Sequence, residues 1–202
     1  MKQLYTIGHS TYPAEHFAEL LKCFEVDCIL DVRSVPFSRH VPQYNRDELK
    51  AFLKQNGIEY HPMGKWFGAR QPDMQFYSEE GYLDFEKFRE SSLFIQGLES
   101  VKRGLDQFNI ALMCSEKDPI DCHRAIMVGR GFELDGTDVK HILHDFSSIT
   151  QAELNARLLD RYFPNRNQIS IFDLGGEKTD EEYLVDAYRI RNSEIGYRPI
   201  EG

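Results

Sequence analysis

The sequence predicts an α/β fold: a three-layer sandwich in which helices cover both faces of a mainly parallel sheet of about five strands. Short apolar runs alternate with helical patterns along the first two thirds of the chain, which is typical of βαβ units. Each apolar run leads directly into polar residues, as expected where parallel strands end at one edge of a sheet. With 202 residues, 41% of them hydrophobic, the chain also has the composition of a globular domain.

Five short apolar runs predict the strands, because each has the length of a strand and is bounded by polar or turn-forming residues. They lie at residues 4–8, 28–32, 58–61, 110–113 and 139–143. The run at 110–113 is the clearest, since all four of its residues are apolar. The polar residues that follow the strands are therefore expected to converge at the carboxyl edge of the sheet.

Apolar residues at helical spacing predict the helices. The first follows Pro13 and carries Phe17, Leu20, Leu21 and Phe24 at positions i, i+3, i+4 and i+7. The others are expected at residues 46–55, 85–107, 123–134, 151–162 and 181–191.

Capping and helix-breaking residues refine these limits. We expect Asn45 to cap the helix that follows it and Gly57 to end that helix. A break is expected near Gly97, within the long helical stretch.

The chain divides into a core domain at residues 1–163, which carries the polar motifs, and a C-terminal extension at 164–202 packed on the core. The helical pattern weakens beyond the core, and Gly175 and Gly176 predict a turn in the extension.

The charge excludes a protein that coats nucleic acid or an anionic membrane with its whole surface, since 24 basic residues face 33 acidic ones and the net charge is −9. No stretch approaches the ~20 apolar residues of a membrane span, and polar residues near the start argue against a signal peptide. We expect a cytoplasmic protein with no membrane partner. Its four cysteines are then free thiols or ligands. The sequence leaves the cofactor and the oligomeric state open.

The sharpest feature is the polar loop at residues 114–124, Cys-Ser-Glu-Lys-Asp-Pro-Ile-Asp-Cys-His-Arg, between a buried strand and a helix. Such a loop presents backbone N–H groups that favour an anion or a thiolate. Cys114 is therefore a candidate nucleophile or redox thiol, with Arg124 binding an anionic substrate group and Glu116 as an alternative acid or base. The candidate bases for the thiol are His9, His123 and His144.

A structural interpretation of the same loop stays open. Free cysteines are among the most buried residues, so Cys114 could simply belong to the core. Asp121 would then cap the following helix, and Arg124 would pair with Glu116 or Asp31.

A metal-dependent hydrolase is a further alternative, with Cys114, Cys122 and His123 as ligands. Zinc sites usually show a close cysteine pair at both ends, and this chain has none.

Asp31 and Arg33, at the end of the second strand, form the next feature. Asp31 could orient a histidine or a substrate hydroxyl, and Arg33 could bind a phosphate or carboxylate through two N–H groups. The alternative is an internal ion pair of Asp31 with Arg33 or Arg124. His9 and Ser10 are expected to line the same pocket, unless this turn only caps the first helix.

Residues 33–70 carry seven basic and three acidic residues, a local charge of +4 in an acidic chain. Aromatic residues lie among these charges, as in grooves that bind single-stranded nucleic acid, and a nucleotide pocket uses the same parts. Lys65 and Trp66 are candidate ligand contacts on a loop that could close over a site. An ordinary solvated loop with Trp66 as part of a hydrophobic lid is the alternative.

Three motifs carry a family resemblance: Tyr-Thr-Ile-Gly-His-Ser-Thr at residues 5–11, Asp-Val-Arg at 31–33, and Met-Cys-Ser-Glu at 113–116 followed by Cys-His-Arg at 122–124. In this order they resemble the domain-of-unknown-function 488 family of cytoplasmic prokaryotic α/β proteins, over roughly residues 2–145. The resemblance implies a shared polar site made of His9, Ser10, Asp31, Arg33, Cys114, Glu116, Cys122, His123 and Arg124. It implies no reaction, although some members carry labels such as DNA repair protein.

A looser similarity is to rhodanese-like sulfurtransferases, which also have an early Asp-Val-Arg and a cysteine between a strand and a helix. Their active loop is short and glycine-rich. Here Arg124 follows Cys114 by ten positions with no glycine between them, which argues against persulfide chemistry.

The leading hypothesis from the sequence is an enzyme that acts on an anionic small molecule or nucleotide through a Cys/His/Arg/Asp site at the carboxyl edge of the sheet. A nucleic-acid-binding module that uses residues 33–70 and a metal-dependent hydrolase are the alternatives.

Overall fold

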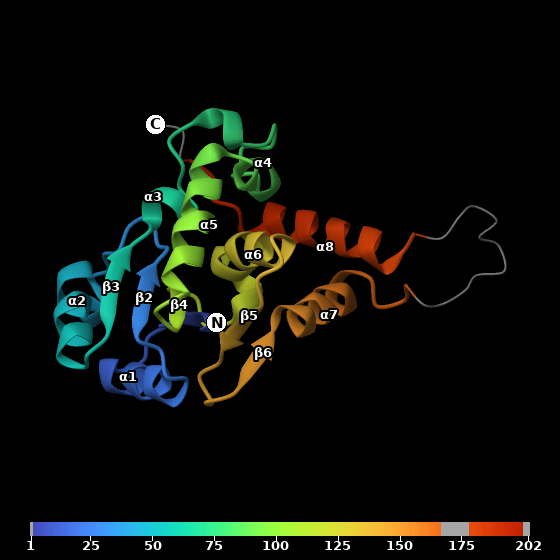
Figure 1. Ribbon diagram of the computed structural model, residues 1–202. Coiled ribbons are helices and arrows are strands. Elements are labelled where there is room, and N and C mark those ends of the chain that lie inside the picture. The colour runs from blue at the N-terminus through green and yellow to red at the C-terminus, as the bar shows by residue number, and fades with distance from the viewer. Residues whose placement is uncertain (1, 167–177, 200–202) are drawn as a thin grey trace.

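The computed structural model describes residues 2–166 and 178–199. A six-stranded sheet with the order β3-β2-β4-β1-β5-β6 forms its centre (Figure 1). The strands are β1 (Leu4–Gly8), β2 (Cys28–Asp31), β3 (Glu59–Pro62), β4 (Ile110–Cys114), β5 (Val139–Ile142) and β6 (Ser148–Thr150). All neighbours are parallel except β5 and β6. The predicted α/β sandwich with a mainly parallel sheet is confirmed, with the short antiparallel β6 as a strand that the sequence did not indicate.

Helices cover both faces of the sheet (Figure 1). They are α1 (Ala14–Cys23), α2 (Arg46–Gln55), α3 (Gly64–Phe67), α4 (Phe85–Arg89), α5 (Ser92–Gly104), α6 (Arg130–Leu134), α7 (Gln151–Tyr162) and α8 (Asp180–Ile195). Short 3₁₀ turns η1 (Pro42–Tyr44), η2 (Met74–Phe76) and η3 (Pro119–Asp121) and the π-helical segment η4 (Arg124–Gly129) connect them. None of the described helices is long and apolar enough to cross a membrane.

The alternation of side chains along the strands divides the core in two. Ile29 of β2 and Met113 of β4 pack with α1 and α2 in one apolar cluster. Their neighbours Leu30 and Leu112 point to the opposite face and join the larger cluster with α5, η4 and α7. Each central strand is thus apolar on both sides, which is why these runs are continuous in the sequence.

The strand register aligns the carboxyl ends of β1, β2 and β4. Gly8 lies opposite Cys114, and Asp31 lies opposite Met113. The backbone N–H of His9 then donates to the carbonyl of Cys114 at 3.0 Å, which continues the ladder into the polar turns. The predicted convergence of these polar residues at one edge of the sheet is confirmed.

The predicted break near Gly97 is wrong. The helical stretch is interrupted at Glu90 and Ser91, where the Ser91 hydroxyl caps α5 by accepting from the N–H of Phe94 at 3.1 Å. Gly97 lies inside α5, and a Cβ there would lie 2.8 Å from side-chain atoms of α3. Close packing therefore explains this glycine.

Two other local predictions have different outcomes. Asn45 occupies the position before α2, but its side-chain oxygen accepts from the N–H of Ser38 at 2.7 Å and does not cap the helix. Gly57 follows the end of α2 with φ 74°, the left-handed conformation expected of a terminating glycine. The helix expected at 123–134 forms as η4 followed by α6.

The described C-terminal segment packs on the core through α8. Tyr188 donates to the Asn155 side chain of α7 at 2.6 Å, and Arg191 donates to the carbonyl of Ile120 at 2.9 Å. The predicted turn at Gly175 and Gly176 lies outside the described residues.

Candidate functional site

Four side chains converge where β4 ends. Cys114 is its last residue, Glu116 lies two residues on in the following loop, and Cys122 and His123 precede η4. One donor atom from each lies within 4.8 Å of every other, a spacing that a single metal ion can span. Both sulfurs approach the same oxygen, Oε2 of Glu116, at 3.1 Å from Cys114 and 2.8 Å from Cys122.

His123 presents a defined nitrogen to this cluster. Its Nε2 lies 3.2 Å from the carbonyl oxygen of Val32, which can only accept, so the proton resides on Nε2. Its Nδ1 faces the sulfurs of Cys114 at 3.7 Å and Cys122 at 4.0 Å. Among the candidate bases, His123 is thus the one that faces Cys114.

The buried side chain of Arg124 holds the loop in place. Its guanidinium is fully buried and donates to the carbonyls of Glu116 at 2.6 Å and Lys117 at 3.2 Å, with no partner for Nε among the described residues. Arg124 thus pairs with neither Glu116 nor Asp31 through a carboxylate. Gly8 permits this closeness, because a Cβ there would lie 1.8 Å from the Glu116 carbonyl oxygen.

The buried thiols differ in acidity. Burial raises the pKa of Cys114 well above its ordinary value, and the neighbouring Cys122 adds to the effect. Burial acts in the same direction on Cys122, but the hydrogen bond from Cys114 and the charge of Arg124 outweigh it and lower the pKa of Cys122 well below its ordinary value. The proton of the pair therefore resides on Cys114 and the thiolate on Cys122.

The other two members of the cluster respond to that thiolate. Burial and the charge of Cys122 raise the pKa of Glu116. Burial alone would lower the pKa of His123, but the hydrogen bond to Cys122 raises it above its ordinary value. Both shifts favour protons beside the Cys122 thiolate, and a metal cation would take the place of these protons.

Asp31 and Arg33 form the internal ion pair that the sequence allowed. The Asp31 carboxylate accepts from Nε of Arg33 at 2.9 Å and from Nη2 at 2.6 Å, and also from the Tyr60 hydroxyl at 2.7 Å. Arg33 donates further to the carbonyl of Tyr44 at 2.8 Å. Most of the hydrogen-bonding groups of this pair are therefore occupied by partners within the protein.

His9 belongs to the ion-pair network of Arg33. Its Nε2 accepts from Arg33 at 3.2 Å, its Nδ1 donates to the Ser10 carbonyl at 2.7 Å, and its ring stacks on Tyr44. Burial and the adjacent Arg33 lower the pKa of His9 to about 4, so the ring is neutral at pH 7. Ser10 is half-buried, and neither it nor Thr11 caps α1, which follows Pro13 without a side-chain cap.

A pocket of about 250 Å³ opens onto the cluster. Cys114, Glu116 and His123 line it, and the guanidinium-bearing side chains of Arg33 and Arg70 lie on its wall. Further lining residues are Ser34, Val35, Ala69, Ser115, Asp121, Ile195 and Tyr197. The pocket thus joins a potential metal site to two cations.

Other predicted residues lie elsewhere. Lys65 and Trp66 are on α3, where Lys65 Nζ is 5.4 Å from the Trp66 ring centre and Trp66 lines a separate pocket. His144 is exposed and stacks beside Tyr12. Asp121 pairs with Arg191 of α8 and does not cap the following helix, which begins without a side-chain cap.

Sequence reasoning missed several participants. In the sequence, Arg70 is only one of the seven basic residues at 33–70, with nothing to mark it as part of a site. Arg70 lies 4.8 Å from the ring centre of Tyr197, and no sequence pattern indicates that Tyr197 belongs to the pocket. Glu116 as a partner of both cysteines had a usable signal, because residues i and i+2 of an extended segment point to the same side.

Comparison with known proteins agrees with this picture. The family model described as "Domain of unknown function DUF488" matches residues 13–130, which include the Asp-Val-Arg motif and the whole cysteine loop but not the motif at residues 5–11. A search of curated proteins and a search of solved structures each gave no match. The family match covers more than half of the chain, and the protein therefore belongs to the DUF488 family.

Proposed function

We propose that this protein is a metal-dependent hydrolase that acts on an anionic small molecule. Cys114, Cys122 and His123 would hold a zinc ion, with Glu116 beside it as acid or base. The observation that carries the proposal is the convergence of these three ligand atoms and a Glu116 carboxylate oxygen within 4.8 Å of one another at the carboxyl edge of the sheet.

The donor set suits zinc. Two sulfurs and an imidazole nitrogen, with an oxygen in the fourth position, are typical ligands of tetrahedral zinc. Sulfur and nitrogen ligands of such a site lie about 3.5 Å apart, as follows from Zn–S and Zn–N bonds of about 2.3 and 2.0 Å. The distances from His123 Nδ1 to Cys114 and Cys122, 3.7 and 4.0 Å, need little adjustment.

The surroundings of the cluster also suit a metal. The Val32 carbonyl fixes the His123 ring in the tautomer that leaves Nδ1 free to ligate, which is a common support for zinc-bound histidines. The N–H of Arg124 points to the Cys122 sulfur at 3.5 Å. Two thiolates, one carboxylate and the buried Arg124 guanidinium together carry a charge that one divalent cation neutralises.

Access to the cluster favours a catalytic site over a structural one. Cys122 is 1% exposed, whereas Glu116 lines the pocket as an exposed residue, with only its Oε2 oxygen turned inward against the two sulfurs. A substrate would thus approach the side of the cluster occupied by Glu116, while the cysteines and His123 hold the metal from within. Arg33 and Arg70 on the pocket wall would attract an anionic group.

The residues divide the chemistry between them. Zinc held in this way acts as a Lewis acid and makes water more acidic. Glu116 would accept the proton of the attacking water and return it to the leaving group, as the non-ligand glutamate does in zinc deaminases with cysteine and histidine ligands. Its raised pKa brings it closer to neutrality, where a group that both accepts and donates protons works best.

Cys114 would then be a metal ligand and not a free nucleophile. Its raised pKa disfavours the thiolate that nucleophilic attack requires. The thiolate character belongs to Cys122, which does not line the pocket. Both features favour the two cysteines as a pair of ligands to one metal ion over Cys114 as a nucleophile.

The first test is the metal content of the purified protein, measured by mass spectrometry with and without added zinc. We expect one zinc per chain, lost in Cys114→Ser and in Cys122→Ser. Cys23→Ser is the matched control, because Cys23 is exposed and remote from the cluster. A protein that neither contains nor takes up zinc, or a Cys114→Ser variant with unchanged zinc affinity, contradicts the proposal.

The second test separates ligation from catalysis. Glu116→Gln should retain zinc and lose hydrolysis of p-nitrophenyl phosphate by about 100-fold or more, as for loss of a general base. A zinc-loaded wild-type protein that is inactive on a panel of anionic esters and amides would leave a zinc-binding protein and refute the hydrolase.

A further inference from the structure

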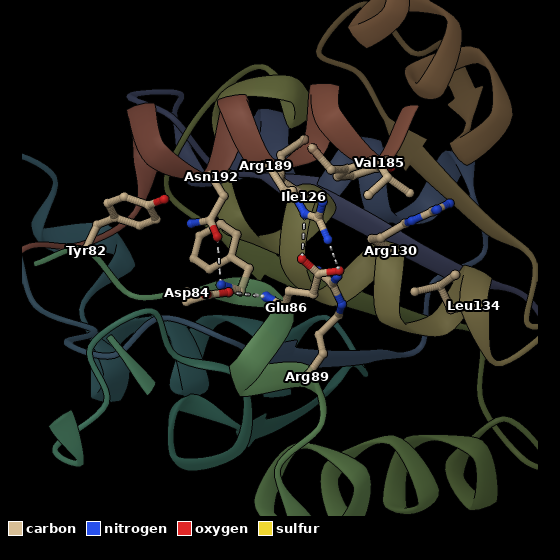
Figure 2. Close-up of a pocket in the computed structure, with 12 residues that line it drawn as sticks. Tyr82, Asp84, Glu86, Arg89, Ile126, Arg130, Leu134, Val185, Arg189 and Asn192 are labelled. Carbon is tan, nitrogen blue, oxygen red and sulfur yellow. Dashed lines mark hydrogen bonds and ion pairs between the residues drawn. The ribbon is translucent and has the colours of Figure 1, made fainter. Parts of the chain in front are cut away.

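A second pocket lies between α4, η4, α6 and α8, and neither cysteine of the cluster lines it. Its volume is about 300 Å³, and it is enclosed by α4, the continuous helix η4–α6 and α8. Figure 2 shows Arg89, Glu86 and Arg189 gathered in its middle, with Tyr82 and Arg130 towards opposite ends. It shares no lining residue with the pocket at the cysteine cluster.

Three arginines line this pocket, and two of them are neutralised. Arg189 donates to both carboxylate oxygens of Glu86, at 2.9 and 3.2 Å. Arg130 donates to Glu133 at 2.6 Å and lies over the Tyr188 ring at 4.7 Å. Arg89 has neither a hydrogen-bond nor an ion-pair partner among the described residues.

The remaining acid in the pocket, Asp84, makes no hydrogen bond or ion pair with Arg89 among the described residues. Asp84 caps α4 by accepting from the N–H groups of Glu86 and Lys87 at 3.0 and 3.1 Å. Burial lowers the pKa of Arg89 and the charge of Arg130 adds to this effect, while the charges of Glu86 and Asp84 act in the opposite direction without cancelling it. An anion at this point would relieve the cost of burying this charge.

The rest of the lining suits an organic body. Phe85 and Ile126 form buried apolar walls, and Leu134 lies at the rim. Pockets of this size commonly bind small molecules through apolar walls and a few placed polar groups.

A buried chain of hydrogen bonds holds one wall in place. Tyr188 donates to Asn155 at 2.6 Å and accepts from Gln151 at 2.7 Å. Gln151 in turn bonds His141 at 2.9 Å, which bonds Thr6 of β1 at 2.8 Å. Such a network fixes the Tyr188 ring over which Arg130 lies, and a site held by rotamer-locked residues is ready for a ligand.

We infer that this pocket binds a small organic oxyanion, a carboxylate or a phosphate ester on an apolar body, with Arg89 as its main charged contact. The site is separate from the proposed zinc centre, so either can exist without the other. Because α8 supplies one wall and follows the segment that matches the family, the pocket depends on the C-terminal part of this chain.

The test is calorimetric titration of the full chain with benzoate, phenyl phosphate and, as an uncharged control, benzyl alcohol. We expect saturable binding of benzoate or phenyl phosphate at a site that Arg70→Gln leaves intact, and no binding of benzyl alcohol; the tighter acid identifies the oxyanion. Arg89→Gln should weaken that binding by at least about tenfold, since a charged hydrogen bond is lost. Lys87→Gln, on the same helix and exposed, is the matched control with unchanged binding.

A second variant guards against misfolding of the first. Leu134 is 63% exposed, so Leu134→Glu should fold and should weaken binding by repelling the anion. Arg70→Gln, in the other pocket, should bind as the wild type does. Absence of saturable binding of both acids at millimolar concentration, unchanged binding in Arg89→Gln, or loss of binding in Arg70→Gln alone would each overturn the inference.

Discussion

Replacing Asp31 by alanine is expected to destabilise the protein by about 3–5 kcal/mol, the cost of breaking a buried ion pair from one side. Asp31 is 1% exposed and accepts from the backbone N–H of Arg33, from its Nε and Nη2, and from the Tyr60 hydroxyl. Without it, the Arg33 guanidinium stays 7% exposed with only the Tyr44 carbonyl and His9 as partners. An uncompensated buried charge is the reason for the large effect.

The assay is urea unfolding followed by circular dichroism, with the free energy of unfolding taken from the midpoint and slope. The matched control is Glu99→Ala, because Glu99 is 53% exposed and pairs with Lys102 at 3.2 Å on the surface. Exposed pairs contribute below about 1 kcal/mol. A loss for Asp31→Ala within about 1 kcal/mol of the control would refute the reasoning that Asp31 compensates a buried Arg33 charge.

Three further predictions concern packing and pH. Gly8→Ala should shift the loop that carries Glu116 and cost about 1–3 kcal/mol as well as zinc affinity, measured by urea unfolding and zinc titration; wild-type values for both would contradict the account. Burial lowers the pKa of His9 to about 4 and that of His141 to about 3. Below about pH 6.5 the unfolded chain therefore binds protons on these histidines that the folded chain does not bind. The free energy of unfolding should consequently fall between about pH 6.5 and 4, by about 3 kcal/mol for His9 alone. His141→Gln should flatten this slope, and an equally steep profile would argue against the assignment. Gly97→Ala should separate α5 from α3, lower the melting temperature and change the fluorescence of the single tryptophan, whereas an unchanged spectrum would show that the contact is loose.

The sheet could be predicted because its strands are continuous apolar runs that only a doubly covered sheet can bury. Strand β6 could not, since Ser148, Ile149 and Thr150 are only half-buried and pair with β5 through tertiary contacts. Gly97 resembled a helix breaker by propensity, but its role is close packing, which depends on residues far away in the sequence. Asp121 resembled a cap, but its partner is Arg191, 70 residues along the chain.

The candidate site, too, could be predicted from the sequence only in part. The cysteines, Glu116 and His123 lie within ten residues of one another, so local sequence was enough to single them out. Their mutual geometry depends on Gly8 and Arg124, which position the loop. Distant contributors to the pocket wall were not predictable, because the chain returns to this edge only in the folded structure.

X-ray absorption at the zinc edge of the zinc-loaded protein tests the proposed centre most directly. We expect two sulfur ligands at about 2.3 Å, with nitrogen or oxygen ligands at about 2.0–2.2 Å completing a four-coordinate shell. Cys122→Ser, which should not retain zinc, should show no zinc–sulfur shell. A shell of nitrogen and oxygen only, or a spectrum unaffected by the loss of Cys122, would contradict the proposed centre.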